Sequence, residues 1–407
     1  MEGSAAKKFN VSGVWLDRPF KIRRLGHFGF NVKDVETCLK FYRDLLGFSI
    51  SDPIDFGPRV KDEEVRKTLG SGIGYFMRHG SDHHSFVLFP KRVLDELGGR
   101  SGREDVTINQ ITWQVGSLRE VTGAEEWLRN LDNPIRRSGR DTPGSNWHVY
   151  PFDPDDNINE LYYGIEQIGW DGYSKPAVFR QRGFQQTPDL PQMSEYDEVQ
   201  AALAEGADLT SGTRDIVDLE PKYDVGGILL PRPFKIVRIG PVRLFVDDVE
   251  AALSFYRDRM GMRVTEEVTY EGHRCVFLRV NTEHHSMALY PKALRAELGL
   301  SEHSACMAFG LQVGGYDQLR NAMSFLQENG VEIRHLPPEL FPGIDYSAFA
   351  LDPDGHALQL YYYMEQIGWD GQPRPSERRA HAAGEWPEAV EPQPDTFGGE
   401  PFLGPLG

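Results

Sequence analysis

Several features are scarce in this 407-residue chain, and each scarcity excludes a class of protein. The three cysteines, Cys38, Cys275 and Cys306, are too few for a disulfide framework and indicate a reducing compartment. None lies near a second cysteine at metal-ligand spacing, so we interpret all three as structural. The chain contains no run of about 18 apolar residues, so no transmembrane helix is predicted. The N-terminal MEGSAAKKFNVSG lacks the apolar stretch of a secretory signal, so we expect a cytoplasmic protein.

Positive charge is also scarce. Lys and Arg number 44 against 61 Asp and Glu, which gives a formal net charge of −17. Nucleic acids and anionic membranes bind through basic patches, so neither is an expected partner. The hydrophobic fraction of 40% is ordinary for a soluble globular protein, and the length suffices for two or three domains.

An internal duplication organises the chain. Four segments recur in the same order: RPFKI (18–22 and 232–236), LGHFGFNVKDVETCLKFYRDLLGF (25–48, as IGPVRLFVDDVEAALSFYRDRMGM at 239–262), HHS (83–85 and 284–286) and ELYYGIEQIGWDG (160–172, as QLYYYMEQIGWDG at 359–371). The offset between the copies falls from 214 to 201 between the second and third segments. The first half therefore carries extra residues there, and their VKDEEVRKTLG stretch predicts a polar helix that caps a pocket.

Each half reads as a strand, a helix and further strands, and then repeats that order. FGFNV alternates as a strand, and the next segment has apolar residues at helical spacing between an N-cap at Asp34 and a stop at Gly47. ITWQV, EVTGAEEWLRNL, WHVYPFD and INELYYG then give a second strand-helix-strand series. The sequence thus predicts an α+β fold with four β-α-β-β-β modules.

Paired modules with these motifs resemble the vicinal oxygen chelate superfamily, which includes glyoxalase I, bleomycin-resistance proteins and type I extradiol catechol dioxygenases. The G-H-[FV] opening, the F-Y-[RT]-D-x-L-G helix end and the DPDD and DPDG turns (153–156 and 352–355) carry the resemblance over most of 20–172 and 234–371. The resemblance implies that the four modules form two paired half-barrel domains. It does not select one reaction within the superfamily.

The ligand positions of the family map onto the first half. His27 stands at the first ligand position and Glu160 at the carboxylate position. The second position, a histidine in a family motif resembling N-H-[LF]-M-L-[EQ]-V, is Gln110 in NQITWQV. Two histidines and a carboxylate hold Fe(2+) in the dioxygenases and leave faces open for catecholate and O2. The resemblance implies a site of these three residues for Fe(2+), or alternatively for Mn(2+) or another divalent metal.

Three further positions resemble the dioxygenases. The family ends its third strand with two histidines, of which the second is the acid/base near O2; here they are His83 and His84. A tyrosine ten residues before the carboxylate contacts the catecholate and corresponds to Tyr150. A family histidine nine residues before that tyrosine is replaced by Asp141. The resemblance implies catalytic roles for His84, Tyr150 and Asp141.

Two positions keep alternatives open. Gln110 binds the metal through its amide oxygen, lies nearby as a hydrogen-bond donor, or marks a lost site. His84 is the acid/base or replaces the missing histidine ligand beside His27 and Glu160. The HHS segment also persists in the second half, which indicates a partly structural role such as bonding a backbone carbonyl.

The second half lacks the ligand set. Pro241, Ala308 and Gln359 stand at the positions of His27, Gln110 and Glu160, and the first two offer no side-chain donor. We expect an inert domain that supports the first half. The repeated EQIGWDG predicts a structural turn that packs Trp170 and Trp369 on the sheet.

Five segments follow from these patterns: an N-terminal extension (1–17), a first domain with the metal site (18–172), a linker with one short helix (173–229), a degenerate structural domain (230–372) and a disordered acidic tail (373–407). The main hypothesis is an extradiol-type dioxygenase that cleaves a catechol-like aromatic with O2. The alternatives are a non-redox isomerase, epimerase, lyase or hydrolase with a Lewis-acid metal, and a metal-free ligand-binding protein. We expect a small aromatic substrate and O2 as partners, and a homo-oligomer.

Overall fold

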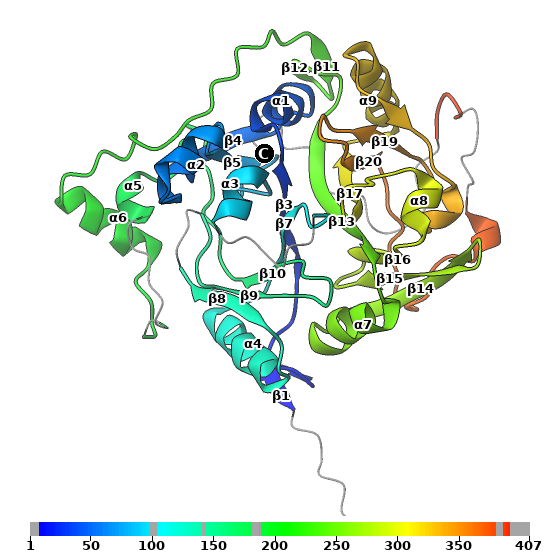
Figure 1. Ribbon diagram of the computed structural model, residues 1–407, viewed down its shortest axis with the longest axis horizontal. Helices are drawn as coiled ribbons and strands as arrows, with labels where there is room; N and C mark the ends of the chain where they lie inside the picture. Colours follow the sequence, from blue (N-terminus) through cyan, green and yellow to red (C-terminus); the bar gives the residue numbers. More distant parts are fainter. Residues whose placement is uncertain are drawn as a thin grey trace, which may run out of the picture.

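Two similar halves lie side by side, each built around one eight-stranded mixed sheet (Figure 1). The computed structural model describes residues 8–97, 104–140, 144–180, 187, 189–379 and 386–390. The strand order is β4-β5-β6-β3-β7-β10-β9-β8 in the first half and β14-β15-β16-β13-β17-β20-β19-β18 in the second. Because the two orders correspond strand for strand, the predicted α+β class and the duplication are confirmed.

The first half contains two modules that share its sheet. The first module has β3 (Arg24–Val32), α1 (Val35–Leu39), η1 (Lys40–Leu45), β4 (Ser49–Asp55), η2 (Gly57–Arg59), α2 (Glu63–Thr68), β5 (Ile73–Arg78), β6 (Phe86–Pro90) and α3 (Lys91–Glu96). The second has β7 (Ile108–Gln114), α4 (Leu118–Asn130), β8 (Ile135–Gly139), β9 (His148–Pro151) and β10 (Asn159–Tyr162). Strand β7 joins the modules, since it pairs antiparallel with β3 and parallel with β10.

The second half repeats this plan. Its first module has β13 (Ile236–Val246), α7 (Val249–Leu253), η3 (Ser254–Arg259), β14 (Arg263–Tyr270), β15 (His273–Arg279), β16 (Met287–Pro291) and α8 (Leu294–Leu298). Its second has β17 (Cys306–Val313), α9 (Tyr316–Glu328), β18 (Ile333–Arg334), η4 (Pro338–Leu340), β19 (Ser347–Leu351) and β20 (Ala357–Tyr361). The central pairings β13–β17 and β17–β20 have the same directions as in the first half.

The duplication extends beyond the expected domain boundaries. A hairpin precedes each half, formed by β1 (Phe9–Val11) and β2 (Val14–Leu16) and by β11 (Tyr223–Val225) and β12 (Ile228–Leu230). After the last strands, α5 (Ala177–Arg180) and η5 (Ser376–Arg378) occupy matching places. The boundaries at 18, 173, 230 and 373 therefore fall inside the repeated unit. The predicted linker helix is present as α6 (Glu195–Ala204), which lies with α5 at one edge in Figure 1.

The predicted helix from Asp34 to Gly47 forms, with its expected signals at both ends. The Asp34 carboxylate accepts a hydrogen bond from the Thr37 backbone N–H, as an N-cap does. Gly47 ends the helix at a φ of +88°, in the left-handed region that favours glycine. The second part of the helix, η1, has π-helical hydrogen bonding, as does η3 in the second half.

Reciprocal contacts join the halves. The hydroxyl of Tyr42 donates to Asp352 in the DPDG turn of the second half, at 2.8 Å. At the matching place the hydroxyl of Tyr256 donates to Asp153 in the DPDD turn of the first half, at 2.7 Å. These buried contacts use the same residues from each copy, so the two halves are related as a pseudo-symmetric pair.

One apolar core runs through both halves. Phe28 on β3 stacks on Phe309 on β17 across the boundary, with 4.1 Å between ring centroids. The three cysteines are buried and free, in agreement with their interpretation as structural residues. None of the helices in the described ranges is long and apolar enough to cross a membrane.

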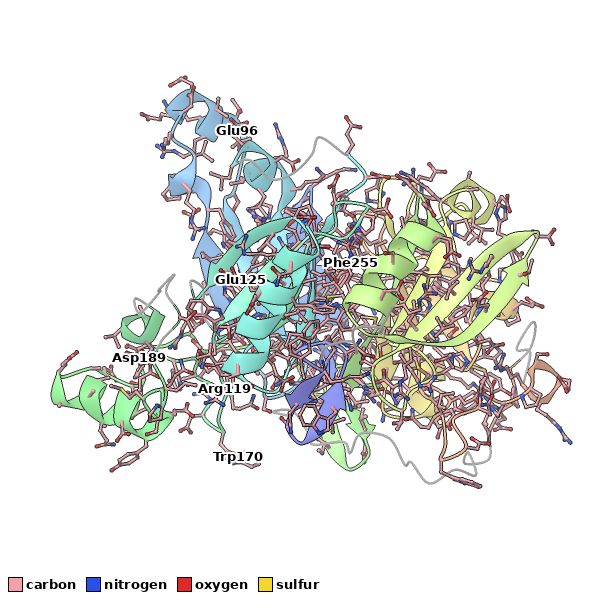
Figure 2. All side chains as sticks on the ribbon, turned by 90° about the horizontal axis from the view of Figure 1, so that it is seen from below. Glu96, Arg119, Glu125, Trp170, Asp189 and Phe255 are labelled. Carbon is pink, nitrogen blue, oxygen red and sulfur yellow. The ribbon has the colours of Figure 1, made fainter. Side chains whose placement is uncertain are left out.

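The prediction that Trp170 and Trp369 pack on the sheet is wrong. Their side chains are 87% and 101% exposed, and Figure 2 shows Trp170 projecting from the edge of the molecule. The EQIGWDG motif has a structural role through its glutamine, which precedes the tryptophan. Gln167 and Gln366 form bridges with Asp82 and Glu283, at the start of each HHS segment.

The expected disorder of the tail does not hold for residues 373–379 and 386–390. Arg379 pairs with Glu266 on β14, and Trp386 packs against Tyr316 of α9. The Tyr316 hydroxyl also donates to the carbonyl of Pro387. The prediction of disorder rested on the Pro- and Glu-rich composition of this segment. A few of its aromatic and arginine side chains nevertheless contact the second half.

Candidate active site in the first half

A cavity of about 560 Å³ opens on the sheet of the first half. It is lined by all the predicted site residues that the structure describes, namely His27, His84, Gln110, Tyr150 and Glu160. The remaining predicted residue, Asp141, lies outside the described residues. The predicted capping helix forms as α2, but the cavity wall comes from the segment just before it, through Phe56 and Arg59.

Strand register brings His27 and Glu160 together. His27 on β3 and Glu160 on β10 both lie opposite Thr112 of the intervening strand β7. The His27 Nε2 atom is 3.0 Å from Glu160 Oε2, and both side chains are buried. The Thr112 hydroxyl donates to the same Oε2 at 3.0 Å. A His–Glu pair therefore stands on the cavity wall at the centre of the sheet.

The Glu160 carboxylate is held in its charged form. Burial alone raises the pKa of this group, but His27, His148 and Thr112 outweigh the burial and hold the pKa below its usual range. The Nδ1 atom of His148 is 3.6 Å from Glu160 Oε1. Neither Thr112 nor His148 is among the residues predicted from the sequence. Their period-two spacing to Gln110 and Tyr150 was the available signal, because alternate strand residues face the same side.

A buried chain of hydrogen bonds orients His84. His83 Nε2 lies 2.8 Å from Asp52 Oδ2, and His83 Nδ1 lies 3.0 Å from His84 Nδ1. Asp52 also accepts from the hydroxyl of Ser174, at 2.9 Å. The predicted hydrogen bond from this histidine pair to a backbone carbonyl is wrong, because His83 bonds to the carboxylate of Asp52 instead.

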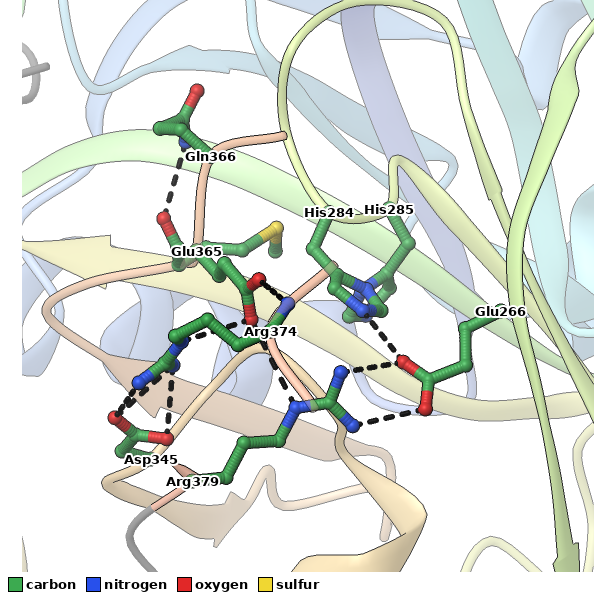
Figure 3. Close-up of polar contacts among 9 residues, drawn as sticks. Glu266, His284, His285, Asp345, Glu365, Gln366, Arg374 and Arg379 are labelled. Atoms are coloured by element: carbon green, nitrogen blue, oxygen red, sulfur yellow. Dashed lines mark hydrogen bonds and ion pairs between the residues drawn. The ribbon is translucent and has the colours of Figure 1, made fainter. Parts of the chain in front are cut away.

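The matching hydrogen bonds in the second half show which nitrogen donates and which accepts at each step. There His284 Nε2 lies 3.0 Å from Glu266, and His284 Nδ1 lies 3.1 Å from His285 Nδ1 (Figure 3). The other nitrogen of His285 lies 3.0 Å from Nη2 of Arg243. A guanidinium only donates, so His285 Nε2 accepts and its Nδ1–H donates to His284.

The same direction in the first half leaves the lone pair of His84 on Nε2. Burial, followed by the nearby His27, His83 and His148, lowers the pKa of His84 well below its usual range. The ring is therefore neutral at physiological pH. His84 lines the cavity and its ring centroid is 4.2 Å from that of His27, so its Nε2 is available as a base or a metal donor.

The remaining wall residues suit a flat ring. Phe56, Phe76 and Phe89 line the cavity and belong to one apolar cluster. The guanidinium of Arg137 lies 4.6 Å from the ring centroid of Tyr150, and both side chains also line the cavity. Apolar rings with a few polar groups are typical of a small-molecule site.

The corresponding place in the second half is filled by side chains. Arg243 is fully buried, and its guanidinium lies 5.3 Å from the centroid of Phe341. The Gln359 amide donates to the Ser347 hydroxyl at 2.9 Å, where the first half has Glu160 and His148. Arg243 corresponds to Gly29 and lies opposite Ala308, the counterpart of Gln110, so a buried cation stands beside the lost ligand positions in the second half.

The donors in the first half fit a divalent cation. His27 Nδ1 and Glu160 Oε1 are buried without a hydrogen-bond partner, and a buried carboxylate is stable only beside positive charge or donors. In the described part of the chain, no three His, Cys, Asp or Glu donors of this cavity lie within 4.8 Å of one another. The Gln110 amide and the His84 imidazole also line the cavity and are the candidates for a third ligand.

Comparisons with known proteins agree with this architecture. The sequence model of the Glyoxalase/Bleomycin resistance protein/Dioxygenase superfamily matches residues 24–161 and 238–360. Among curated proteins, 3-methylcatechol 2,3-dioxygenase from Pseudomonas putida is 33% identical over 89 residues, and 2,2',3-trihydroxybiphenyl dioxygenase from Sphingomonas paucimobilis is 25% identical over 133 residues. These matches cover 20% and 33% of this chain, and only 27% and 44% of those relatives.

Solved structures resemble the fold over most of the chain. A catechol 2,3-dioxygenase structure has a TM-score of 0.52 at 16% identity and covers 92% of this chain and 96% of its own. Homoprotocatechuate 2,3-dioxygenase from Brevibacterium fuscum has a TM-score of 0.54 at 15% identity, with 89% of each chain covered. A Mn(II)-bound glyoxalase from Novosphingobium aromaticivorans has a TM-score of 0.52 at 15% identity, covering 86% and 85%. At these identities the likeness shows a shared fold.

Proposed function

Because the chain belongs to the Glyoxalase/Bleomycin resistance protein/Dioxygenase superfamily, we propose that its first half is a metal-dependent ring-cleavage dioxygenase acting on a catechol-like aromatic. The observation that carries the proposal is the buried His27–Glu160 pair beside a neutral His84 on one cavity wall. The two curated relatives are named as dioxygenases of catecholic compounds, which supports this reaction class.

The proposed ligands are His27, Gln110 and Glu160, with Fe(2+) as the metal. When bound, the metal would supply a site for both substrate oxygens and O2, which brings the two reactants together and acidifies the catechol. Gln110 is the preferred third ligand because the cavity offers no third His or carboxylate donor within 4.8 Å, as judged from the described residues. A neutral amide donates less charge to iron than imidazole does.

The side chains of the chain itself handle the proton and the orientation of the substrate. His84 Nε2 carries the lone pair, so it accepts a proton from a substrate hydroxyl and later returns it. The hydrogen-bonded chain through His83 to Asp52 holds the ring and stabilises its protonated form. The Tyr150 hydroxyl positions the substrate oxygen, and the Phe56–Phe76–Phe89 cluster excludes water from the ring.

Paired variants at matching strand positions test the proposal. Fe(2+)-loaded wild-type protein is expected to consume O2 with at least one member of a catechol panel. Glu160→Ala is expected to lose retained iron and at least about 100-fold in O2 uptake, because a ligand is removed. Gln359→Ala, at the same position in the second half, is expected to retain both. Equal losses in the two variants would exclude a site confined to the first half.

A second pair separates the acid/base role from ligation. His84→Ala is expected to keep its iron while turnover falls by about 10²–10⁴-fold, the usual contribution of a general base. His285→Ala, in the matching pair of the second half, is expected to leave turnover nearly unchanged. Loss of iron in His84→Ala would instead assign His84 as the third ligand.

A non-redox Lewis-acid enzyme is the second candidate, and Gln110 is the observation that favours it. A His-Gln-Glu set is rich in oxygen and suits Mn(2+), Mg(2+), Ni(2+) or Zn(2+). Gln110→His distinguishes the two reactions. In an oxygenase this variant is expected to retain iron and O2 uptake at or above the wild-type level. In a Lewis-acid enzyme it is expected to change metal preference and lower activity without O2 consumption.

A further inference from the structure

A second group of metal-type donors lies at the boundary between the halves, away from the cavity. Asp354 lies in the DPDG turn between β19 and β20, His356 directly follows this turn, and His303 lies in the loop before β17. Each offers one donor atom, and the three atoms lie within 4.8 Å of one another. It is the one such group of His, Cys, Asp and Glu side chains among the residues described.

One ring nitrogen of His356 is held by a carboxylate and the other faces a hydroxyl group. Its Nδ1 lies 3.1 Å from Asp352 Oδ2, and its Nε2 lies 3.0 Å from the hydroxyl oxygen of Thr107 in the first half. A carboxylate accepts, so in the neutral ring the proton is on Nδ1 and the lone pair on Nε2. Metal-binding histidines typically donate their second ring N–H to a carboxylate in this way. The Thr107 hydroxyl can donate to Ser304 Oγ instead, at 2.5 Å.

His303 contributes an unused donor. Its Nε2 is buried and has no hydrogen-bond partner, although the ring as a whole is partly exposed. The ring centroid lies 5.0 Å from that of His356. The ring also covers Gly355, where an added Cβ would lie 3.3 Å from His303 Cε1. The unpartnered Nε2 thus belongs to a ring that packs against the turn, and burying it is costly unless another group binds it.

Asp354 supplies the anionic donor and a link to the other half. One of its carboxylate oxygens, Oδ2, accepts from the backbone N–H of Lys33 at 3.3 Å. His356 likewise contacts Thr107 of the first half, so two of the three side chains, Asp354 and His356, bond across the boundary. A cation bound here would hold the DPDG turn and the loop of His303 together at the boundary.

The matching place in the first half lacks this donor set. The duplication aligns Asp105 with His303 and Asn157 with His356. Asp105 pairs with Lys292 and Arg295 of the second half, at 2.7 and 3.0 Å. Both histidines are therefore peculiar to the second half and are not required by the repeated turn.

We propose that His303, Asp354 and His356 form a binding site for a divalent transition-metal ion of the zinc class at the boundary between the halves. Two imidazoles and one carboxylate suit Zn²⁺ and its neighbours rather than Ca²⁺ or Mg²⁺, which prefer oxygen ligands. The site does not depend on the proposed dioxygenase. Its role is structural, because bound metal stabilises the folded chain in proportion to its affinity.

The test is Zn²⁺ titration of the full chain by calorimetry and thermal melting, with Glu160→Ala as the background so that the cavity does not contribute. This background is expected to bind one Zn²⁺ and to melt at a higher temperature in its presence. His303→Ala and Asp354→Asn, both in surface loops, are each expected to weaken binding at least tenfold and to abolish the thermal shift. His335→Ala, an exposed histidine of the same half, is the matched control and is expected to behave like the background.

A further variant tests the orientation of His356. Asp352→Asn is expected to weaken Zn²⁺ binding by about 10–100-fold, because the carboxylate that fixes the tautomer is lost. The melting temperature without zinc measures any structural effect separately. Unchanged Zn²⁺ affinity in both His303→Ala and Asp354→Asn overturns the proposal, as does an equal loss in His335→Ala.

Discussion

Glu266 on β14 ties the end of the repeated unit to the second sheet, and its replacement by glutamine should show how much this contact stabilises the fold. The carboxylate accepts from Arg379 at 2.6 and 2.9 Å and from His284 at 3.0 Å (Figure 3). Partial burial raises its pKa, but His284 and Arg379 outweigh the burial and lower the pKa to about 2. Arg379 belongs to the segment expected to be disordered, so the variant tests the corrected boundary.

The sign of the pH dependence follows from the lowered pKa. A carboxylate whose pKa is depressed in the fold adds stability above its unfolded value near 4.5, and this is lost as pH falls towards 2. The difference between the unfolded and folded pKa values corresponds to about 3.4 kcal/mol, at 1.36 kcal/mol per pKa unit. Screening by solvent at this partly exposed position reduces the expected contribution to about 1–2 kcal/mol.

The measurement is urea unfolding of wild type and Glu266→Gln, followed by circular dichroism between pH 7 and pH 3. The stability difference is expected to be constant at about 1–2 kcal/mol above pH 5 and to shrink steadily below it. A matched control, Glu267→Gln, removes a carboxylate on the same strand whose arginine partner is exposed, and is expected to have a smaller effect. A difference for Glu266→Gln that stays constant down to pH 3 would refute the reasoning.

Three further substitutions probe the boundary between the halves and the surface. Tyr42→Phe removes a buried hydrogen bond to the Asp352 carboxylate and should cost about 1.5–3 kcal/mol in urea unfolding; a cost below about 0.5 kcal/mol would contradict its role. Phe28→Ala removes a ring stacked on Phe309 and should cost about 3–5 kcal/mol, measured in the same assay. Trp170→Ser should change stability by less than about 0.5 kcal/mol, and a larger loss would restore the idea that this side chain packs on the fold.

The duplication made the fold predictable, and the strands that escaped prediction are those with weak patterns. The helix after Asp34 has a cap, an apolar stripe and a glycine stop, so its bounds were clear. By contrast, β4 contains Asp-Pro-Ile-Asp and β8 contains Arg-Arg-Ser, and neither strand alternates cleanly between buried and exposed residues. Both are edge strands of their sheet, held in place by pairing to one neighbour.

The candidate site was predictable where family motifs mark it and hidden where strand register creates it. His27, His84, Gln110, Tyr150 and Glu160 were identified from motifs, and they line one cavity. Period-two spacing places Thr112 and His148 on the same strand faces as Gln110 and Tyr150, but their approach to Glu160 depends on the register of β7, β9 and β10, which local spacing does not reveal. Arg243 was missed for the same reason, since its partner His285 is 42 residues away.

The most direct test of the central claim is the stoichiometry of O2 uptake by anaerobically purified, Fe(2+)-loaded protein across a panel of catechols. We predict that one O2 is consumed for each catechol cleaved, and that His27→Ala abolishes the reaction. Binding of catechols by the iron-loaded protein without any O2 consumption would contradict the oxygenase assignment and favour the Lewis-acid reaction.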